Sequence, residues 1–226
     1  MSTKAMQHIE VCRGIDPGQC PHRIAASAEF AERLERVVRE SGWPAFLEVR
    51  HGARLHFHHA FRLAISGCPN GCSRPHIQDL GLIRAERPAL DPVACSSCGL
   101  CAESCPDGAM TMRAMAGTNG DEAELPAIDP ERCLRCGHCV RVCPTGALRA
   151  AEQGWRIVAG GRLGRRPTLG RELPGLFNDE QALAILDRAL RLYMERGQKG
   201  QRFGALLDEV GIGALMSEGV AEGAGQ

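Results

Sequence analysis

Eight of the twelve cysteines fall into two runs with the same spacing. Each run reads C-x2-C-x2-C-x3-C and is followed by proline: Cys95, Cys98, Cys101 and Cys105 in the first, and Cys133, Cys136, Cys139 and Cys143 in the second. Three cysteines two residues apart can wrap a tight loop around one cube of iron and sulfide, and the fourth opens a helix that reaches a neighbouring cube. The spacing therefore predicts two [4Fe–4S] clusters.

The two runs resemble the bacterial two-cluster ferredoxins, and the resemblance extends from about Asp91 to Ala150. It implies that the runs exchange their last ligand. One cluster would take Cys95, Cys98, Cys101 and Cys143, and the other would take Cys133, Cys136, Cys139 and Cys105. A pair of zinc sites is the alternative, because C-x2-C is also a zinc signal. Four evenly spaced cysteines ending in Cys-Pro, twice over, favour clusters.

The remaining four cysteines are the number that one further cube requires: Cys12, Cys20, Cys68 and Cys72. Two of them lie in the segment Ser66-Gly67-Cys68-Pro69-Asn70-Gly71-Cys72-Ser73-Arg74-Pro75. This segment resembles the sirohaem–cluster motif of the sulfite and nitrite reductase superfamily. In that family a C-x3-C pair joins an upstream cysteine pair to hold a [4Fe–4S] cluster, and its last cysteine bridges the cluster to sirohaem iron. The resemblance therefore implies a third cluster, with Cys72 as the bridging residue.

The same resemblance covers most of residues 10 to 215. Gly160-Gly161-Arg162-Leu163-Gly164 is similar to the glycine-rich loop that follows a ferredoxin insert in the family. The upstream pair departs from the family spacing, since Cys12 and Cys20 read C-x7-C where C-x5-C is usual. We expect the two extra residues to bulge without loss of the ligands. Family members also have a preceding half-domain, whereas eleven residues precede Cys12, so we expect a partner chain to complete any sirohaem pocket.

Reduction of an oxyanion such as sulfite or nitrite requires cationic side chains beside it and a route for electrons. Arg74 directly follows the cysteine pair, and Arg162 lies in the glycine-rich loop. Arg54 and His56 share one face of a predicted strand that leads to Cys68. We hypothesise that these residues contact sirohaem carboxylates or substrate. For the strand face, an ordinary exposed polar surface remains the alternative.

Local patterns predict the elements that position these residues. Asn178 and Gln181 have the spacing of a capping box, which predicts the start of a helix. Alternating apolar residues predict strands, and apolar residues on one side of a helical turn predict helices. The predicted strands are Ala45–Arg50, Arg54–Ile65 and Trp155–Ala159, and the predicted helices are Ser27–Ser41, Asn178–Gly197 and Arg202–Val210. The acidic segment between the two cysteine runs is expected to be a surface loop.

Together these features predict an α+β fold built from two domains. A sulfite-reductase-like [4Fe–4S] half-domain would comprise residues 1–90 and 151–216. A ferredoxin-like dicluster domain would be inserted between its parts at residues 91–150. Residues 217–226 are small and polar, and we expect them to be disordered.

Composition restricts the environment and the partners of the protein. Lysine plus arginine and aspartate plus glutamate each number 27, so no charge bias indicates nucleic acid or anionic membranes. No apolar run approaches the roughly 20 residues that span a bilayer, and the first residues lack a secretory pattern. Many cysteines without a secretory signal favour metal ligation over disulfides. We expect a cytoplasmic protein.

Two functions are consistent with these residues. In the first, the chain is an iron–sulfur oxidoreductase subunit that passes electrons through three [4Fe–4S] clusters within a larger redox complex, without necessarily binding sirohaem. In the second, sulfite or nitrite is reduced at a sirohaem bridged by Cys72, with the pocket completed by a partner chain. Both require redox partner proteins. The sequence shows no P-loop and no G-x-S-x-G or H-E-x-x-H motif that would indicate other chemistry.

Overall fold

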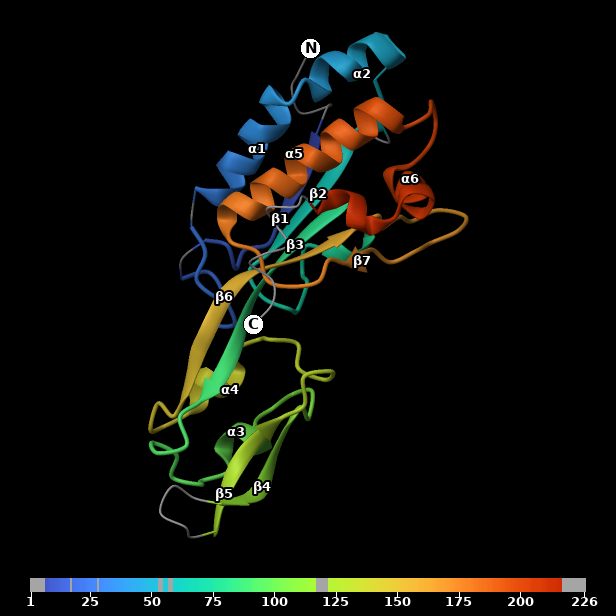
Figure 1. Ribbon diagram of the computed structural model, residues 1–226. Coiled ribbons are helices and arrows are strands. Elements are labelled where there is room, and N and C mark those ends of the chain that lie inside the picture. Colours follow the sequence, from blue (N-terminus) through green and yellow to red (C-terminus); the bar gives the residue numbers. More distant parts are fainter. Residues whose placement is uncertain are drawn as a thin grey trace. The chain divides into compact units, whose positions relative to one another are not determined.

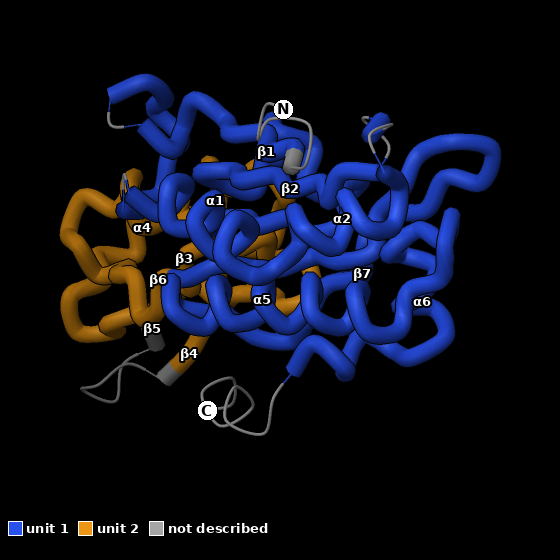
Figure 2. Tube along the Cα trace, turned by 90° about the horizontal axis from the view of Figure 1, so that it is seen from above, with its two compact units in different colours: residues 1–84, 154–226 blue, residues 85–153 orange. Residues whose placement is uncertain are grey.

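The computed structural model describes residues 7–16, 18–27, 29–52, 55–56, 59–116 and 122–216. The chain divides into two units, coloured separately in Figure 2: the first unit is Met1–Arg84 with Gly154–Gln226, and the second unit is Ala85–Gln153. The second unit extends a few residues beyond the segment 91–150 at both ends. The tail predicted at residues 217–226 lies outside the described residues.

A five-stranded sheet has the strand order β1-β2-β3-β6-β7 (Figure 1). Its strands are β1 (Gln7–Val11), β2 (Phe61–Ser66), β3 (Leu80–Leu90), β6 (Leu148–Ala159) and β7 (Arg171–Glu172). The pairs β1–β2 and β2–β3 are parallel, and β6–β7 is antiparallel. Nearly every side chain of β2 is buried, as in a parallel strand covered on both faces. The strand predicted at Trp155–Ala159 is confirmed as part of β6.

Helices cover this sheet in the first unit. They are α1 (Phe30–Glu40), α2 (Trp43–His51), α5 (Asp179–Arg196) and α6 (Phe203–Val210), with 3-10 turns η3 (Pro75–Ile77) and η4 (Ile212–Leu215). Helices α1 and α5 lie side by side over one face of the sheet (Figures 1 and 2). The capping box is confirmed, since the Gln181 amide donates to Asn178 Oδ1 at 2.9 Å and the Asn178 amide donates to Gln181 Oε1 at 2.9 Å.

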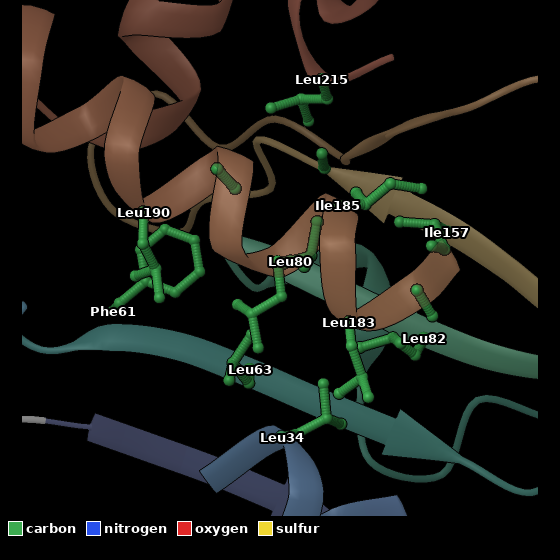
Figure 3. Packing of buried hydrophobic residues seen from close by; sticks show 14 of the residues in the cluster. Leu34, Phe61, Leu63, Leu80, Leu82, Ile157, Leu183, Ile185, Leu190 and Leu215 are labelled. Atoms are coloured by element: carbon green, nitrogen blue, oxygen red, sulfur yellow. The ribbon is translucent and has the colours of Figure 1, made fainter. Parts of the chain in front are cut away.

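The core of the first unit lies between these helices and the strands. Leu34 of α1 and Leu183 and Leu190 of α5 pack toward Leu63 of β2 and Leu82 of β3 (Figure 3). Burial of a leucine side chain contributes roughly 1.5–3 kcal/mol. This core fixes the position of β2, and the Cys68–Cys72 loop follows the last residue of that strand.

One predicted strand is wrong, and another is confirmed only in its last part. Ala45–Arg50 lies within α2, because Gly42 adopts a left-handed conformation (φ 86°) with Pro44 in the first turn that follows. Trp43 and Leu47, four residues apart, are both buried, and this is the spacing of one helical face. The predicted long strand begins only at Phe61.

The basic strand face does not form in the described part of the chain. The His56 amide donates to His59 Nδ1 at 3.2 Å, so these residues form a turn before β2. Arg54 and His58 lie outside the described residues. The alternation of residue types therefore does not correspond to a strand before Phe61 in the described part of this segment.

The second unit contains an antiparallel pair, β4 (Met110–Ala116) and β5 (Glu122–Ile128), with the short helices α3 (Leu100–Glu103) and α4 (His138–Val142). The predicted acidic surface loop is therefore wrong for Glu122–Ile128. In β5, Glu124 is exposed while Leu125 is buried, so the Glu124 charge lies on the outer face of a strand. Asp121 lies outside the described residues.

A buried ion pair connects several elements of the first unit. Asp79 is 3% exposed, and its Oδ2 accepts from the Arg62 amide at 3.0 Å and lies 3.6 Å from Arg62 Nε. Arg202 Nη2 lies 4.0 Å from Oδ1, and the Asp79 carbonyl accepts from the Gly160 amide at 2.9 Å. Burial raises the pKa of Asp79, and the charges of Arg62 and Arg202 oppose that rise.

Replacement of Asp79 by alanine is expected to destabilise the first unit by about 3–5 kcal/mol, because it leaves the Arg62 guanidinium buried without its carboxylate. Anaerobic urea unfolding followed by circular dichroism measures the change. Asp187→Ala is the control, since this carboxylate pairs with Arg191 on the exposed face of α5 and its loss should have no measurable effect. Equal effects of the two substitutions would contradict a structural role for Asp79.

Candidate iron–sulfur sites

The two cysteine loops of the second unit share one backbone conformation. In each loop the middle cysteine, Cys98 or Cys136, lies between two left-handed residues: Ser97 (φ 55°), Gly99 (φ 76°), Arg135 (φ 59°) and Gly137 (φ 66°). Few non-glycine residues adopt this conformation, so its recurrence at equivalent positions is a specific feature. Helix α3 begins directly after Gly99, and α4 begins directly after Gly137. The sequence repeat is therefore also a repeat of structure.

Two pockets of this unit are each lined by four cysteines. One pocket is lined by Cys95, Cys98, Cys101 and Cys143, and the other by Cys133, Cys136, Cys139 and Cys105. The structure thus brings the cysteines together in the crossed groups that the ferredoxin resemblance implies. Apolar side chains complete the walls, among them Leu90 and Met112 in one pocket and Met110 and Ile128 in the other.

The thiols of each pocket lie close enough to interact electrostatically. Burial raises the pKa of Cys139 to about 12, and the neighbouring Cys136 and Cys133 add to the rise. Burial likewise raises the pKa of Cys101, with further contributions from Cys95 and Cys143. Several thiolates can share such a pocket only if a cationic centre compensates their charge. The donor set of each pocket therefore fits a metal cluster.

The last cysteine of each run also receives a backbone hydrogen bond. The Ala109 amide donates to Cys105 Sγ at 3.3 Å, and the Leu148 amide donates to Cys143 Sγ at 3.5 Å. The bond from Leu148 is the largest contribution to a lowered pKa of Cys143. Hydrogen bonds to cluster sulfur atoms stabilise the thiolate and tune the reduction potential.

The four remaining cysteines also meet, at the carboxyl ends of two parallel strands. Cys12 follows β1, and its amide donates to the Ile65 carbonyl of β2 at 2.9 Å. Cys12 Sγ accepts from the Gly67 amide at 3.3 Å. Burial raises the pKa of Cys68, which is raised further by interactions with Cys12, Cys20 and Cys72. These thiols come from two distant segments of the first unit.

Two glycines allow these segments to approach. A Cβ atom on Gly67 would lie 2.5 Å from the Gly14 carbonyl oxygen, and one on Gly14 would lie 3.3 Å from Cys12 Sγ. The Ser66 and Ser73 hydroxyls form a buried hydrogen bond of 2.6 Å across the base of the Cys68–Cys72 loop. Sterics and a local hydrogen bond thus hold the loop in place.

Arg74, predicted to face a cofactor, is paired with a carboxylate of β1. It has a left-handed backbone (φ 56°), and its Nη2 and Nε donate to the two carboxylate oxygens of Glu10 at 2.7 and 3.2 Å. Burial acts to raise the pKa of Glu10, but hydrogen bonds from His8 and Arg74 outweigh it, so that the pKa is lowered. The Arg74 guanidinium therefore has a partner within the chain.

The other predicted cation positions also have defined surroundings. Arg162 Nη1 lies 3.2 Å from Asp208 Oδ2, and Arg171 pairs with the same carboxylate. The glycine-rich loop packs against the segment after Cys72, because a Cβ atom on Gly161 would collide with the His76 carbonyl oxygen. The Gly170 amide, beyond the loop, donates to the same carbonyl at 2.7 Å. His56 is exposed and precedes β2, whereas Cys68 follows it; Arg54 lies outside the described residues.

Among the described residues, no three or more histidine, cysteine, aspartate or glutamate side chains surround a single point as the ligands of one metal ion would. The described helices also include none long and apolar enough to cross a membrane.

Comparison with known proteins agrees with this geometry. Residues 50–222 match the family described as the nitrite and sulphite reductase 4Fe-4S domain. The coenzyme F420-dependent sulfite reductase of Methanocaldococcus jannaschii is 33% identical over 204 residues, which cover 89% of this chain and 29% of that protein. The crystal structure of dissimilatory sulfite reductase I superposes with a TM-score of 0.56 and 21% identity, over 92% of this chain and 50% of that one.

The fold and the cysteine loops define an oxidoreductase domain of mixed α/β architecture with an iron–sulfur redox role. The chain belongs to the nitrite and sulphite reductase 4Fe-4S domain family. It spans less than a third of the length of the curated relative and half of the structural one. The similarity to the crystal structure shows the fold alone.

Proposed function

We propose that this chain transfers electrons through three [4Fe–4S] clusters as a subunit of a larger redox complex. The observation that carries the proposal is the crossed grouping of eight cysteines in two pockets of the second unit. The meeting of Cys12, Cys20, Cys68 and Cys72 supports the third cluster. Each bound cluster would accept and release one electron.

In this proposal the second unit is a two-cluster ferredoxin domain inserted into the family domain. The repeated loop conformation around Cys98 and Cys136 supports it. The residues of the chain contribute thiolates, amide donors to sulfur and apolar walls that exclude water. All twelve cysteines are unpaired, which suits a reducing compartment such as the cytoplasm. A carrier without a nucleotide motif also needs a donor and an acceptor protein.

Metal analysis of anaerobically purified protein tests the proposal. We expect about twelve iron and about twelve acid-labile sulfide per chain, and electron paramagnetic resonance signals of [4Fe–4S] clusters after reduction. A content of about eight iron would remove the third cluster from the proposal. Stoichiometric zinc in place of iron would overturn it entirely.

The alternative is sirohaem-dependent reduction of sulfite or nitrite, with a partner chain completing the pocket. It is favoured by the exposure of Cys72, since Cys68 of the same loop is buried; an exposed thiolate suits a bridge to a second cofactor. The name of the Methanocaldococcus jannaschii relative, a sulfite reductase, agrees with it. Arg74 and Arg162 would have to exchange Glu10 and Asp208 for the anionic groups of the cofactor or substrate.

We expect the isolated chain to contain clusters without sirohaem, since two of its candidate cations, Arg74 and Arg162, are paired with carboxylates of the chain itself. Acid–acetone extraction of the purified protein, followed by visible spectroscopy, measures any tetrapyrrole. A porphyrin-type spectrum at about one equivalent per chain would reject the electron-transfer proposal in its simple form and support the alternative. Purification from sirohaem-producing cells is the necessary control.

A further inference from the structure

The two cysteine loops of the second unit differ in what covers them, although their backbones match. A Cβ atom on Gly99 would meet no atom within 4 Å, and Cys98 beside it is exposed. At the equivalent position in the second loop, a Cβ atom on Gly137 would collide with Oε1 of Glu86. Cys136 beside it is only partly exposed. A carboxylate therefore occupies space in the second loop that is open in the first.

Glu86 is held firmly in this place. It lies on β3 with 6% exposure, and its amide donates to the Arg135 carbonyl at 2.8 Å. Its Oε2 accepts from Gln153 Nε2 at 2.5 Å. It also forms an isolated parallel bridge with Cys136. Backbone and side chain thus both hold Glu86 against the loop.

The second loop is secured at the same cysteine by Arg141 of α4. Arg141 Nη1 donates to the Cys136 carbonyl at 3.2 Å and would lie 3.2 Å from a Cβ atom on Gly137. Gly137 is therefore enclosed by Glu86 and Arg141. Neither group would meet a Cβ atom on Gly99.

We propose that Glu86 is a positioning residue that makes the two clusters of the second unit unequal. It fixes the backbone around Cys136 and holds its carboxylate against the loop whose cysteine would bind a cluster together with Cys133, Cys139 and Cys105. A negative charge in a poorly solvated site opposes the addition of an electron. The cluster of the second loop is therefore harder to reduce than the cluster of the exposed first loop. This inference rests on the proposed function.

Glu86→Gln removes the charge and keeps an oxygen that can accept from Gln153. Redox titration of the whole chain, followed by electron paramagnetic resonance, should show one cluster with a more positive midpoint potential and the other two clusters unchanged. Glu152→Gln is the control. Glu152 precedes Gln153 in β6, and its carboxylate pairs with Arg87 at 3.0 Å. It should shift no potential.

Two glycine variants separate the contact with Glu86 from backbone strain. Gly137→Ala and Gly99→Ala both place a side chain on a left-handed residue, so both carry similar strain. Only Gly137→Ala displaces Glu86. We expect it to shift the potential of the same cluster as Glu86→Gln and to speed the loss of about four iron to a chelator. Gly99→Ala should do neither.

The inference is overturned if Glu86→Gln leaves every potential unchanged, or if the two alanine variants behave alike. Iron and sulfide are counted in the same preparations. Wild-type protein with fewer than about eight iron in the second unit contradicts the proposed function and the role of Glu86 with it. Full iron content with unchanged potentials contradicts the role of Glu86 alone.

Discussion

The double variant Cys105→Ala, Cys133→Ala is expected to retain about eight iron atoms per chain, as many as either single variant. These two cysteines belong to different runs but line the same pocket. Loss of either thiolate removes a ligand of the same cluster. Loss of the second thiolate therefore causes no further loss of iron. The iron and sulfide contents of the two single variants and the double variant, each purified anaerobically, measure this non-additivity.

The matched comparison is the double variant Cys101→Ala, Cys105→Ala. Its two cysteines belong to one run but line different pockets. It should therefore lose two clusters and retain about four iron atoms per chain. The opposite pattern, with loss of one cluster here and of two clusters in the first double variant, would show that each run binds its own cluster. Crossed ligation would then be rejected.

The second large effect is expected from Gly67→Ala. The new Cβ atom would lie 2.5 Å from the Gly14 carbonyl oxygen, which is closer than any normal contact. Because this oxygen is a backbone atom, the segment that carries Cys12 and Cys20 must move away from the Cys68 loop. We expect loss of the third cluster and retention of about eight iron atoms in the second unit.

Gly213→Ala is the control for this variant, since a Cβ atom there would meet no atom within 4 Å. It should bind the full complement of iron. Electron paramagnetic resonance of the reduced Gly67→Ala protein should still show the paired clusters of the second unit. A Gly67→Ala protein with about twelve iron atoms would mean that Cys12 and Cys20 do not serve the Cys68 loop.

Two of the failures among the predicted elements have one cause. In Ala45–Arg50 and in Arg54–Ile65, short alternations of residue type favoured strands. Burial of Trp43 and Leu47 against the core stabilises a helix in the first case, and the His56–His59 turn ends the pattern in the second. A local alternation of residue types does not show which side chains will be buried. In both segments, the packing of side chains determined the secondary structure.

Glu86 has no motif to reveal it in the sequence. It is a single acid in β3, a strand whose other residues are mostly buried and apolar, and only its contact with Gly137 gives it a role. The partners of Arg74 and Arg162 could not be predicted from the sequence either, because Glu10 and Asp208 lie far from these arginines along the chain. Such pairs depend on which strands and helices become neighbours.

The sequence by itself determined which residues are the candidate ligands. The spacing of the cysteine runs, the Cys-Pro-Asn-Gly-Cys segment and the capping box of Asn178 act within a few residues, so local geometry is enough to interpret them. Only the tertiary structure decided which cysteines share a pocket, how Cys12 reaches the Cys68 loop, and which cations already have partners. Those facts depend on distances between remote residues, and strand pairing and the burial of side chains set such distances.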